Sequence, residues 1–260
     1  MFSKRVLTVA LFLVFGFLRP PAGSLRAQPA GLPAGSHAAG RLTVTAVAAY
    51  AKHDFRPFPY ELPIYLAKVS YGLTGWLDLA LLGGAADLRG EHAAKGDSWW
   101  SEGYKPAAGV GILFDPLRLG PLSTYVAATV LGYTNRGAHW REQLAEGERR
   151  VFWNATDQKI GELLVVGGLA LQVGKTRLYS GAGISRWWRR VEVSEELHRG
   201  AQKTVLGHEV KTYDGDPAIA PLAGLELRLP HRLFLSIEAS GKSSDDFWIS
   251  VGIGQTGSPD

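Results

Sequence analysis

Near its end the chain reads Phe247-Trp248-Ile249-Ser250-Val251-Gly252-Ile253-Gly254. Successive side chains of a β-strand point to opposite faces, so the odd-numbered residues of this stretch share one face and the even-numbered residues share the other. The first face is apolar, and the second mixes one tryptophan with small or polar residues. This period of two predicts a strand whose faces meet different environments.

Moving back along the chain, the same pattern recurs in segments of about ten residues. In residues 218–229, for example, Leu225 and Leu227 alternate with Glu226 and Arg228. We predict ten strands, at residues 41–53, 63–71, 76–89, 106–114, 122–135, 161–173, 177–193, 218–229, 232–240 and 246–254.

The connections between these segments alternate between short and long. The short ones are residues 72–75, 115–121, 174–176 and 230–231, and the longer ones are residues 54–62, 90–105, 136–160, 194–217 and 241–245. Outer-membrane barrels have short periplasmic turns and longer external loops, and an even strand count brings both termini to the periplasmic side. We therefore predict an all-β fold, a single antiparallel up-and-down transmembrane β-barrel of about ten strands over residues 41–254, with eight strands as the alternative.

Charged residues are concentrated in the long connections, above all in residues 90–105 and 136–160. A charge on the lipid face near the bilayer midplane costs about 2–4 kcal/mol. A surface in water would tolerate charges in the middle of a strand. The distribution therefore favours a lipid surround, although alternation alone does not tell which face of each strand points inward.

The first residues have the pattern of an export signal. Two basic residues, Lys4 and Arg5, precede an apolar run of 13 residues, 6–18, and a transmembrane helix needs about 20. We predict a cleaved signal peptide at residues 1–27, with cleavage near Ala27 or alternatively near Ser24. Residues 28–40 are expected to form a flexible lead-in, and residues 255–260 a tail.

The composition excludes several classes of function. Without residues 1–27 the basic count falls from 28 to 24, equal to the 24 acidic residues, so the basic character of the whole chain indicates no nucleic-acid partner. The chain has no cysteine, and its seven histidines lack a metal-ligand spacing. We expect no metal and no cofactor, and the expected partner is the lipid bilayer; protein partners are not indicated.

One hairpin carries a family resemblance. The sequence Tyr71-Gly72-Leu73-Thr74-Gly75-Trp76-Leu77-Asp78-Leu79, followed by Leu82-Gly83-Gly84-Ala85-Ala86, resembles the strand-turn-strand hairpins of small bacterial outer-membrane β-barrel proteins. The resemblance is local, and over residues 41–254 it is one of pattern. It implies a location in the outer membrane of a Gram-negative cell.

Aromatic residues are candidates for the girdles that flank the lipid-facing band. In residues 122–135, Tyr125 and Tyr133 stand near the two ends of one apolar face, and we predict that this face meets lipid. Trp140, Trp187 and Trp188 are expected at the external girdle, where amphipathic rings prefer the headgroup level. The alternative role for the tryptophans is a platform for a sugar or a partner.

Charged residues on the predicted inward positions are candidates for a site in the lumen. They are Lys68, Asp78, Glu226, Arg228 and Glu238. Charges in a narrow lumen must pair or be hydrated, and side chains fill the interior of small barrels. We interpret the five residues as an ion-pair network that fills the barrel, with a solute-conducting path as the alternative.

No residue is assigned a catalytic role. Ten strands is also the count in omptins, which are outer-membrane proteases with acidic pairs and an Asp-His site near the external rim. The nearest acids here are Asp214-Gly215-Asp216, His53-Asp54 and Asp245-Asp246, and none lies in a matching segment. We predict a non-enzymatic outer-membrane protein with a structural, surface-binding or narrow-pore role. The alternatives are an outer-membrane hydrolase with a site at the rim, and a soluble periplasmic β-barrel that binds an apolar ligand.

Overall fold

The structure is a computed structural model of the whole chain. It describes residues 39–53, 60–90, 103–143, 149–199, 202–215, 217–243 and 246–257. The predicted signal peptide and nearly all of the lead-in lie outside these residues. Within them, no helix is long and apolar enough to cross a membrane.

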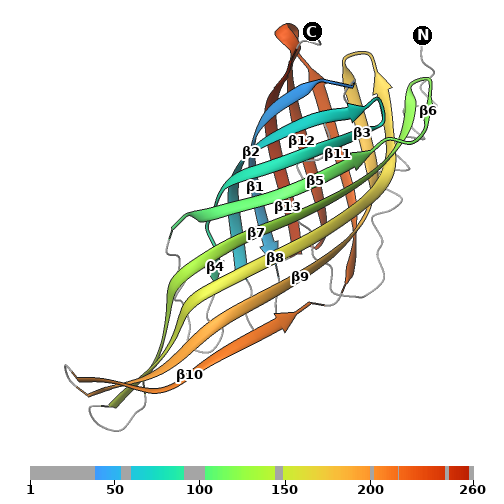
Figure 1. The fold of residues 1–260 in the computed structure, drawn as a ribbon. Coiled ribbons are helices and arrows are strands. Elements are labelled where there is room, and N and C mark those ends of the chain that lie inside the picture. The colour runs from blue at the N-terminus through green and yellow to red at the C-terminus, as the bar shows by residue number, and fades with distance from the viewer. Residues whose placement is uncertain are drawn as a thin grey trace.

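The described residues form a closed antiparallel barrel of ten strands (Figure 1). Each strand pairs with its neighbours in sequence order, and β1 closes the barrel by pairing with β13 on one side and β2 on the other. The barrel strands are β1 (Leu42–His53), β2 (Tyr60–Thr74), β3 (Leu77–Ala86), β5 (Lys105–Phe114), β7 (Leu122–Gln143), β8 (Arg149–Val173), β9 (Thr176–Arg199), β11 (Ala218–Arg228), β12 (Leu233–Ser243) and β13 (Asp246–Thr256). The predicted fold class and strand count are confirmed.

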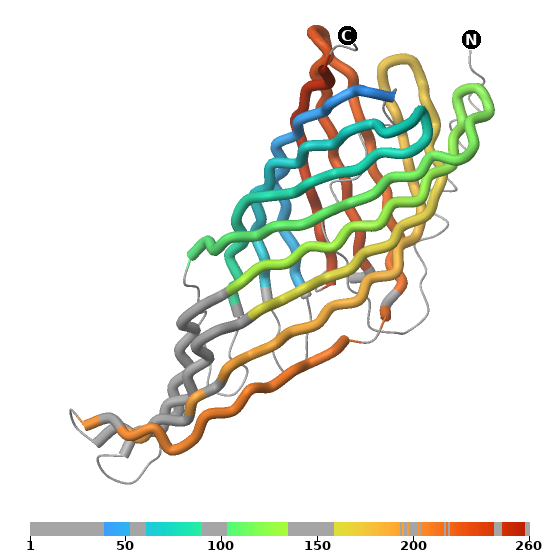
Figure 2. The backbone as a smooth tube through the Cα atoms, viewed as in Figure 1, coloured from blue at the N-terminus to red at the C-terminus, as the bar shows by residue number. Residues whose placement is uncertain are grey.

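The short connections gather at one end of the barrel, where β1 begins and β13 ends (Figure 2). The turn between β8 and β9 uses Gly174 at a φ of 59°, a left-handed conformation that glycine adopts at little steric cost. A 3-10 turn, Pro230–Arg232, joins β11 to β12, and the two-residue strand β6 (Arg118–Leu119) folds back on β7. By the rule for outer-membrane barrels, this is the periplasmic end.

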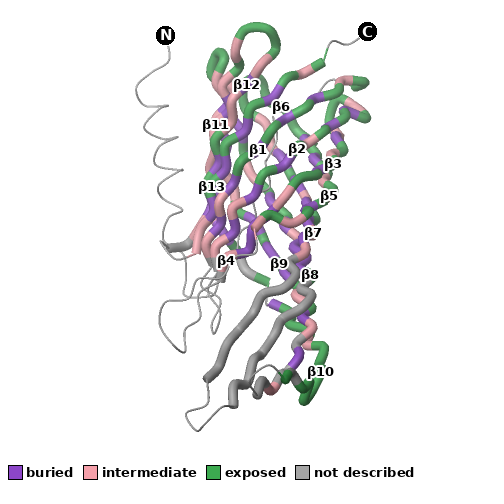
Figure 3. The backbone as a smooth tube through the Cα atoms, turned by 90° about the vertical axis from the view of Figure 1, so that its left-hand side faces the viewer, coloured by how far each residue is buried: buried purple, intermediate pink, exposed green. Residues whose placement is uncertain are grey.

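The outer face of the barrel is aliphatic around its circumference. Along β13 buried and exposed residues alternate, with Trp248 and Ser250 inside and Ile249 and Val251 outside (Figure 3). The same holds for the other strands, whose exposed large aliphatic residues include Val44, Val69, Leu81, Val110, Val126, Val165, Leu169, Ile184, Ile219 and Ile237. An apolar surface of this extent marks contact with lipid.

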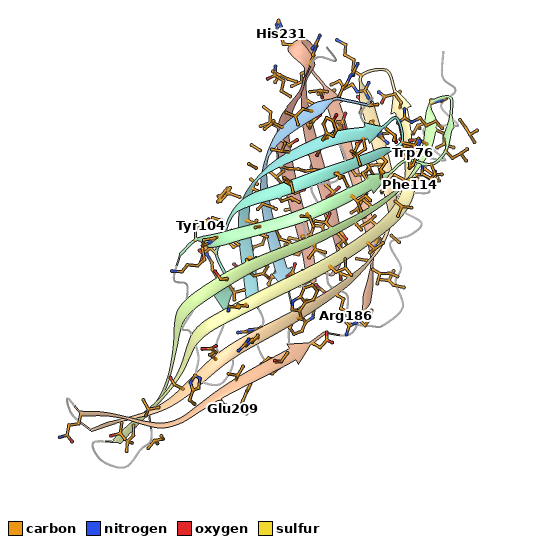
Figure 4. All side chains as sticks on the ribbon, in the orientation of Figure 1. Trp76, Tyr104, Phe114, Arg186, Glu209 and His231 are labelled. Carbon is orange, nitrogen blue, oxygen red and sulfur yellow. The ribbon has the colours of Figure 1, made fainter. Side chains whose placement is uncertain are left out.

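Aromatic rings border this aliphatic belt at both ends. At the periplasmic end Trp76 and Phe114 make an edge-to-face contact, with ring centroids 5.3 Å apart (Figure 4). At the other end Tyr65 contacts Tyr104 at 5.4 Å between centroids. On β2, the eight positions from Tyr65 to Leu73 correspond to about 20 Å along the membrane normal, given a rise of about 3.3 Å per residue and a tilt of about 40°. The belt therefore approaches the height of about 25 Å that the apolar band of an outer-membrane barrel has.

Three barrel strands, β7, β8 and β9, continue past the barrel on the side opposite the termini, where a fourth strand joins them (Figure 1). Strand β5 pairs with β7 only as far as Tyr133, but β7 and β8 stay paired to Gln143 and Arg150. Strand β10 (Gln202–Asp214) pairs with the outer part of β9. We call residues 134–143, 149–159, 189–199 and 202–214 the outer sheet.

The outer sheet corrects two predictions. Residues 136–160 and 194–217 were expected to be loops, and most of each is strand. In water both faces of a strand can be polar, so the apolar alternation that reveals a membrane strand is missing there. Strand β6 also falls in a segment predicted as a connection, and β4 (Arg89–Gly90) spans the predicted boundary between the strand at residues 76–89 and the connection after it.

Candidate functional site

The periplasmic half of the lumen contains buried acidic residues on several strands. Asp78 on β3, Glu226 on β11 and Glu238 on β12 are all buried, and Lys68 on β2 shares the inward face with them. The carboxylates of Glu238, Asp78 and Glu226 all act electrostatically on the Lys68 ammonium group. Four of the five lumen candidates thus lie inside the barrel.

The fifth candidate, Arg228, lies at the periplasmic mouth. Its side chain is exposed, and its Nε is 3.6 Å from Oε1 of the buried Glu226. The guanidinium therefore neutralises a lumen carboxylate while remaining in contact with water.

A second ionic group, centred on Asp115, was not among the predicted site residues. Its carboxylate accepts a hydrogen bond from Arg118 Nε at 3.1 Å and lies 3.9 Å from Arg177 Nη2. Arg118 also donates to the carbonyl of Gly75 at 3.0 Å, and Arg177 donates to Ser123 Oγ at 3.3 Å. The group ties together the periplasmic ends of four strands. Asp115 and Arg118 fall in a short connection, where sequence reasoning treats charges as solvated.

Tyr125, Tyr133 and Trp187 do not belong to an aromatic girdle, because all three are buried inside the barrel. The prediction that the tyrosine face of residues 122–135 meets lipid was wrong. The opposite face, with Val126 and Val130, is the exposed one. Both faces of this strand are apolar, so the alternation does not distinguish them, and the lumen of this barrel accepts large rings.

Of the two remaining girdle candidates, Trp188 and Trp140, only Trp188 has a side chain that the structure describes. Trp188 is exposed on the outer face of β9, and a Cβ placed on the neighbouring Gly161 would lie only 2.2 Å from its indole ring. The ring therefore lies flat against the backbone of β8. The side chain of Trp140 lies outside what the structure describes.

The buried tyrosines hold lumen carboxylates. Tyr133 donates a 2.7 Å hydrogen bond to Glu162 Oε1, and Tyr179 donates a 3.1 Å bond to Glu238 Oε2. The rings of Tyr125 and Tyr179 meet edge to face at 6.1 Å. A carboxylate that accepts such bonds keeps its charge at a lower desolvation cost.

The outer half of the lumen is filled mainly by apolar side chains, which surround the hydrogen-bonded pair Tyr133–Glu162. Its buried residues include Leu62, Ile64, Leu131, Leu164 and Trp248. A cavity of about 40 Å³ remains in the periplasmic half, which is space for about three water molecules.

At the opposite rim, two of the candidate acids can be placed, Asp246 at the start of β13 and Asp214 at the end of β10. Asp214, at the end of β10, accepts a 3.2 Å hydrogen bond from Arg186 Nε and a second bond from Arg186 Nη2 (Figure 4 labels Arg186). The guanidinium holds the pKa of this carboxyl below its ordinary value. Asp216, Asp54 and Asp245 lie outside the described residues. Within the described part of the chain, no three His, Asp or Glu side chains converge to hold a metal ion.

These observations define the class of the protein. A closed barrel with an aliphatic exterior, aromatic borders and buried charges is a transmembrane β-barrel of the bacterial outer membrane. The alternative of a soluble periplasmic barrel is wrong, because such a barrel would place its large aliphatic residues inside and its charges outside.

No protein-family model and no curated protein matches the sequence. Among solved structures, the chain is similar to the outer membrane protease OmpT from Escherichia coli (TM-score 0.47, 10% identity, 84% of this chain and 96% of that chain). It is also similar to the translocator domain of the autotransporter NalP from Neisseria meningitidis (TM-score 0.43, 9% identity, 96% and 95%). A third is Ail, the attachment invasion locus protein of Yersinia pestis (TM-score 0.31, 10% identity, 84% and 97%).

Proposed function

We propose that this protein is a non-enzymatic surface-binding protein, in which the barrel is a sealed anchor and the outer sheet is the binding element. The observation that carries the proposal is the continuation of β7, β8 and β9 beyond the barrel wall, where β10 joins them. A barrel that served only as a membrane component would need no sheet beyond the lipid.

The packed lumen argues against a pore. Permeation of a hydrophilic solute needs a continuous polar path, and in this barrel Leu62, Ile64 and Leu131 fill the outer half. Moving a hydrated solute through that layer would require several strands to separate. The ionic residues of the periplasmic half therefore support the wall and form no conduction pathway.

Strand β10 has the properties of a contact surface. The apolar side chains of Val205, Leu206, Val210 and Tyr213 are exposed. Among the described residues, β10 pairs only with β9, so one row of its backbone groups faces away from the sheet. Exposed apolar side chains beside an unpaired strand edge are common features of protein-binding surfaces.

The proposal is tested by shortening the outer sheet on an intact barrel. In the variant, a two-residue Asn-Gly turn joins Asn135 to Gln158, and another joins Val191 to Lys211; each pair consists of cross-strand partners. Cells that display the full chain or the variant are applied to immobilised extracellular-matrix proteins and polysaccharides. We expect the full chain to bind at least one of these and the variant to bind none, while both keep heat-modifiable migration in detergent gels.

Two results would contradict the proposal. One is steady single-channel conductance of the full chain in a planar bilayer, which would indicate a pore. The other is cleavage of a peptide library by cells that display the full chain, which would favour the hydrolase alternative.

A further inference from the structure

The charges that the barrel exposes at its periplasmic end are of one sign. In the part of the chain that the structure describes, the acids nearest the periplasmic turns, Asp78, Asp115 and Glu226, are all buried. The exposed charged side chains of these turns and of the adjoining strand ends are basic, and they are Arg118, Lys175, Arg228 and Arg232. At the opposite end the exposed cations have acidic neighbours, as in the pairs Arg186–Asp214 and Lys211–Glu209.

The basic character of the periplasmic end is not cancelled by the charges in the lumen. The described residues of this half of the barrel include four carboxylates, those of Asp78, Asp115, Glu226 and Glu238, and an equal number of interior and mouth cations, Lys68, Arg118, Arg177 and Arg228. Three further cations, Arg41, Lys175 and Arg232, occur at the same end without further described acids. Cations therefore outnumber acids by three in this half.

Three consecutive periplasmic turns carry the exposed cations side by side. The backbone N–H of Gln172 donates to the carbonyl of Pro121 at 2.7 Å, which joins the β5–β7 turn to the end of β8. The N–H of Arg228 donates to the carbonyl of Lys175 at 2.8 Å, which joins the β8–β9 turn to the end of β11. These bonds hold the turns in one continuous row. We call Arg118, Lys175 and Arg232, one from each turn, the basic arc.

The basic arc lies at the edge of the lipid-facing belt. Leu117 and Leu119, on either side of Arg118, are exposed, and so is Val173, two residues before Lys175. Arg118 also donates to the carbonyl of Gly75, next to the girdle residue Trp76. Exposed apolar side chains interleaved with cations suit the boundary between acyl chains and headgroups, where long basic side chains extend their charge toward phosphate.

The turn that carries Arg232 is strained. His231 and Arg232 have φ values of 58° and 62°, and the N–H of Leu233 donates to the carbonyl of Pro230. A two-residue turn with both central residues in this region normally uses Asn-Gly, because other side chains are crowded there. Both side chains are exposed, and His231 projects from the tip of the barrel (Figure 4). Strain of this kind is characteristic of functional positions.

We propose that the basic arc binds anionic phospholipids of the inner leaflet, with phosphatidylglycerol as the simplest ligand. Arginine and lysine donate charge-assisted hydrogen bonds to phosphate oxygens, and basic residues near a membrane surface attract anionic lipids. The leucine residues beside Arg118 favour a lipid over the anionic polymer of the cell wall, because a polymer in water offers them no apolar surroundings. The site is independent of the function proposed for the outer sheet.

The first test measures which lipid gathers at the arc. The full chain with Val173→Cys carries a fluorophore there and is refolded into phosphatidylcholine vesicles that contain a small fraction of nitroxide-labelled phosphatidylglycerol or nitroxide-labelled phosphatidylcholine. We expect the local concentration of the anionic lipid, read from quenching, to be about five times that of the zwitterionic lipid at low salt. The ratio should fall toward one in 1 M sodium chloride, because salt screens the attraction.

Variants at the two ends of the barrel show whether the preference belongs to the arc. Lys175→Gln should bring the quenching ratio at the same label close to one. Arg190→Gln removes an exposed arginine at the opposite end and should leave the ratio unchanged. Heat-modifiable migration verifies that each variant is folded. Equal quenching by the two lipids in the unaltered arc at low salt would overturn the proposal.

The strained turn provides a variant that separates binding from stability. His231→Asn combined with Arg232→Gly gives the turn the pair that its backbone favours, so we expect the barrel to resist urea better in phosphatidylcholine vesicles. A fluorophore introduced with Ile253→Cys, on the exposed face of β13, should at the same time lose its preference for the anionic lipid. If the preference survives this change and Lys175→Gln, the arc does not bind the lipid. Arc-dependent sedimentation with purified peptidoglycan, without any lipid preference, would also contradict the proposal.

Discussion

The hydroxyl of Tyr179 on β9 reaches across β11 to Glu238 on β12, at 3.1 Å. The bond is possible because Gly224 stands between them: it is the cross-strand partner of Tyr179 on one side and of Glu238 on the other. The tyrosine ring lies in the space that a side chain at Gly224 would occupy. Three neighbouring strands are thus fastened from inside the barrel.

This arrangement predicts a specific effect of Gly224→Ala. The added Cβ would lie 2.3 Å from Cζ of Tyr179, so the ring must move and lose its bond to Glu238. We expect a loss of about 1–3 kcal/mol in the free energy of unfolding, as for other overpacked interiors, measured by urea unfolding in micelles. The control is Gly83→Ala on β3, where a Cβ meets nothing within 4 Å. An equal loss in both variants would show that the close approach at Gly224 has no special role.

A pair of tyrosine variants tests how the lumen carboxylates are stabilised. Tyr133→Phe removes the donor to the buried Glu162, and leaving such an acceptor without its partner costs about 1–3 kcal/mol. Tyr125→Phe is the matched control, because the Tyr125 hydroxyl is buried and has no partner among the described residues. We expect Tyr133→Phe to destabilise the barrel and Tyr125→Phe to leave it unchanged in the same urea assay. The reverse order would contradict the hydrogen-bond assignment.

Two equally exposed valines distinguish lipid from water. Val251 on β13 and Val210 on β10 are each 44% exposed. Val251 lies in the aliphatic belt, where an arginine costs about 2–4 kcal/mol near the midplane, whereas Val210 lies in the outer sheet. We expect Val251→Arg to lower the stability of the barrel in lipid vesicles by that amount and Val210→Arg to have almost no effect. Similar effects at both positions would place the belt outside the membrane.

The ion pair at the rim predicts a dependence on pH. Arg186 lowers the pKa of the Asp214 carboxyl, so the contact is fully formed above the ordinary value and is lost as the pH falls through the lowered one. Carbon-13 NMR of the Asp214 carboxyl should give a midpoint below 3.8. In Arg186→Gln the midpoint should rise toward that ordinary value. Lys211→Gln, which removes the partner of Glu209, should leave it unchanged.

Membrane strands are predictable from this sequence because contact with lipid limits one face of each strand to apolar residues. The inward and outward residues of β13 follow directly from the alternation at residues 247–254. On β7 the same reasoning assigned Tyr125 to the wrong face, since both faces are apolar there. Which face of β7 points inward depends on the space above glycine residues of neighbouring strands, such as Gly168 beside Tyr125. That space depends in turn on the register between strands, which one sequence does not reveal.

The outer sheet and the Asp115 group were missed for a related reason. Strand β10 lies in water on both faces, and its sequence has the charge and polarity of a loop. Asp115 and Arg177 are 62 positions apart in the numbering, and only barrel closure brings them together. Pattern analysis identifies surfaces that face lipid, whereas contacts across the lumen require the three-dimensional register.

The aliphatic face of each barrel strand points out into lipid, and this orientation can be measured residue by residue. Because the chain has no cysteine, single cysteines at positions 247–254 can carry spin labels one at a time, and collisions with oxygen and with a polar nickel chelate can be measured in vesicles. We predict high oxygen contact at 249, 251 and 253, greatest at 251, and little contact with either reagent at 248, 250 and 252. Uniform values along the strand, or high contact with the nickel chelate at 251, would show that this face of β13 does not meet lipid.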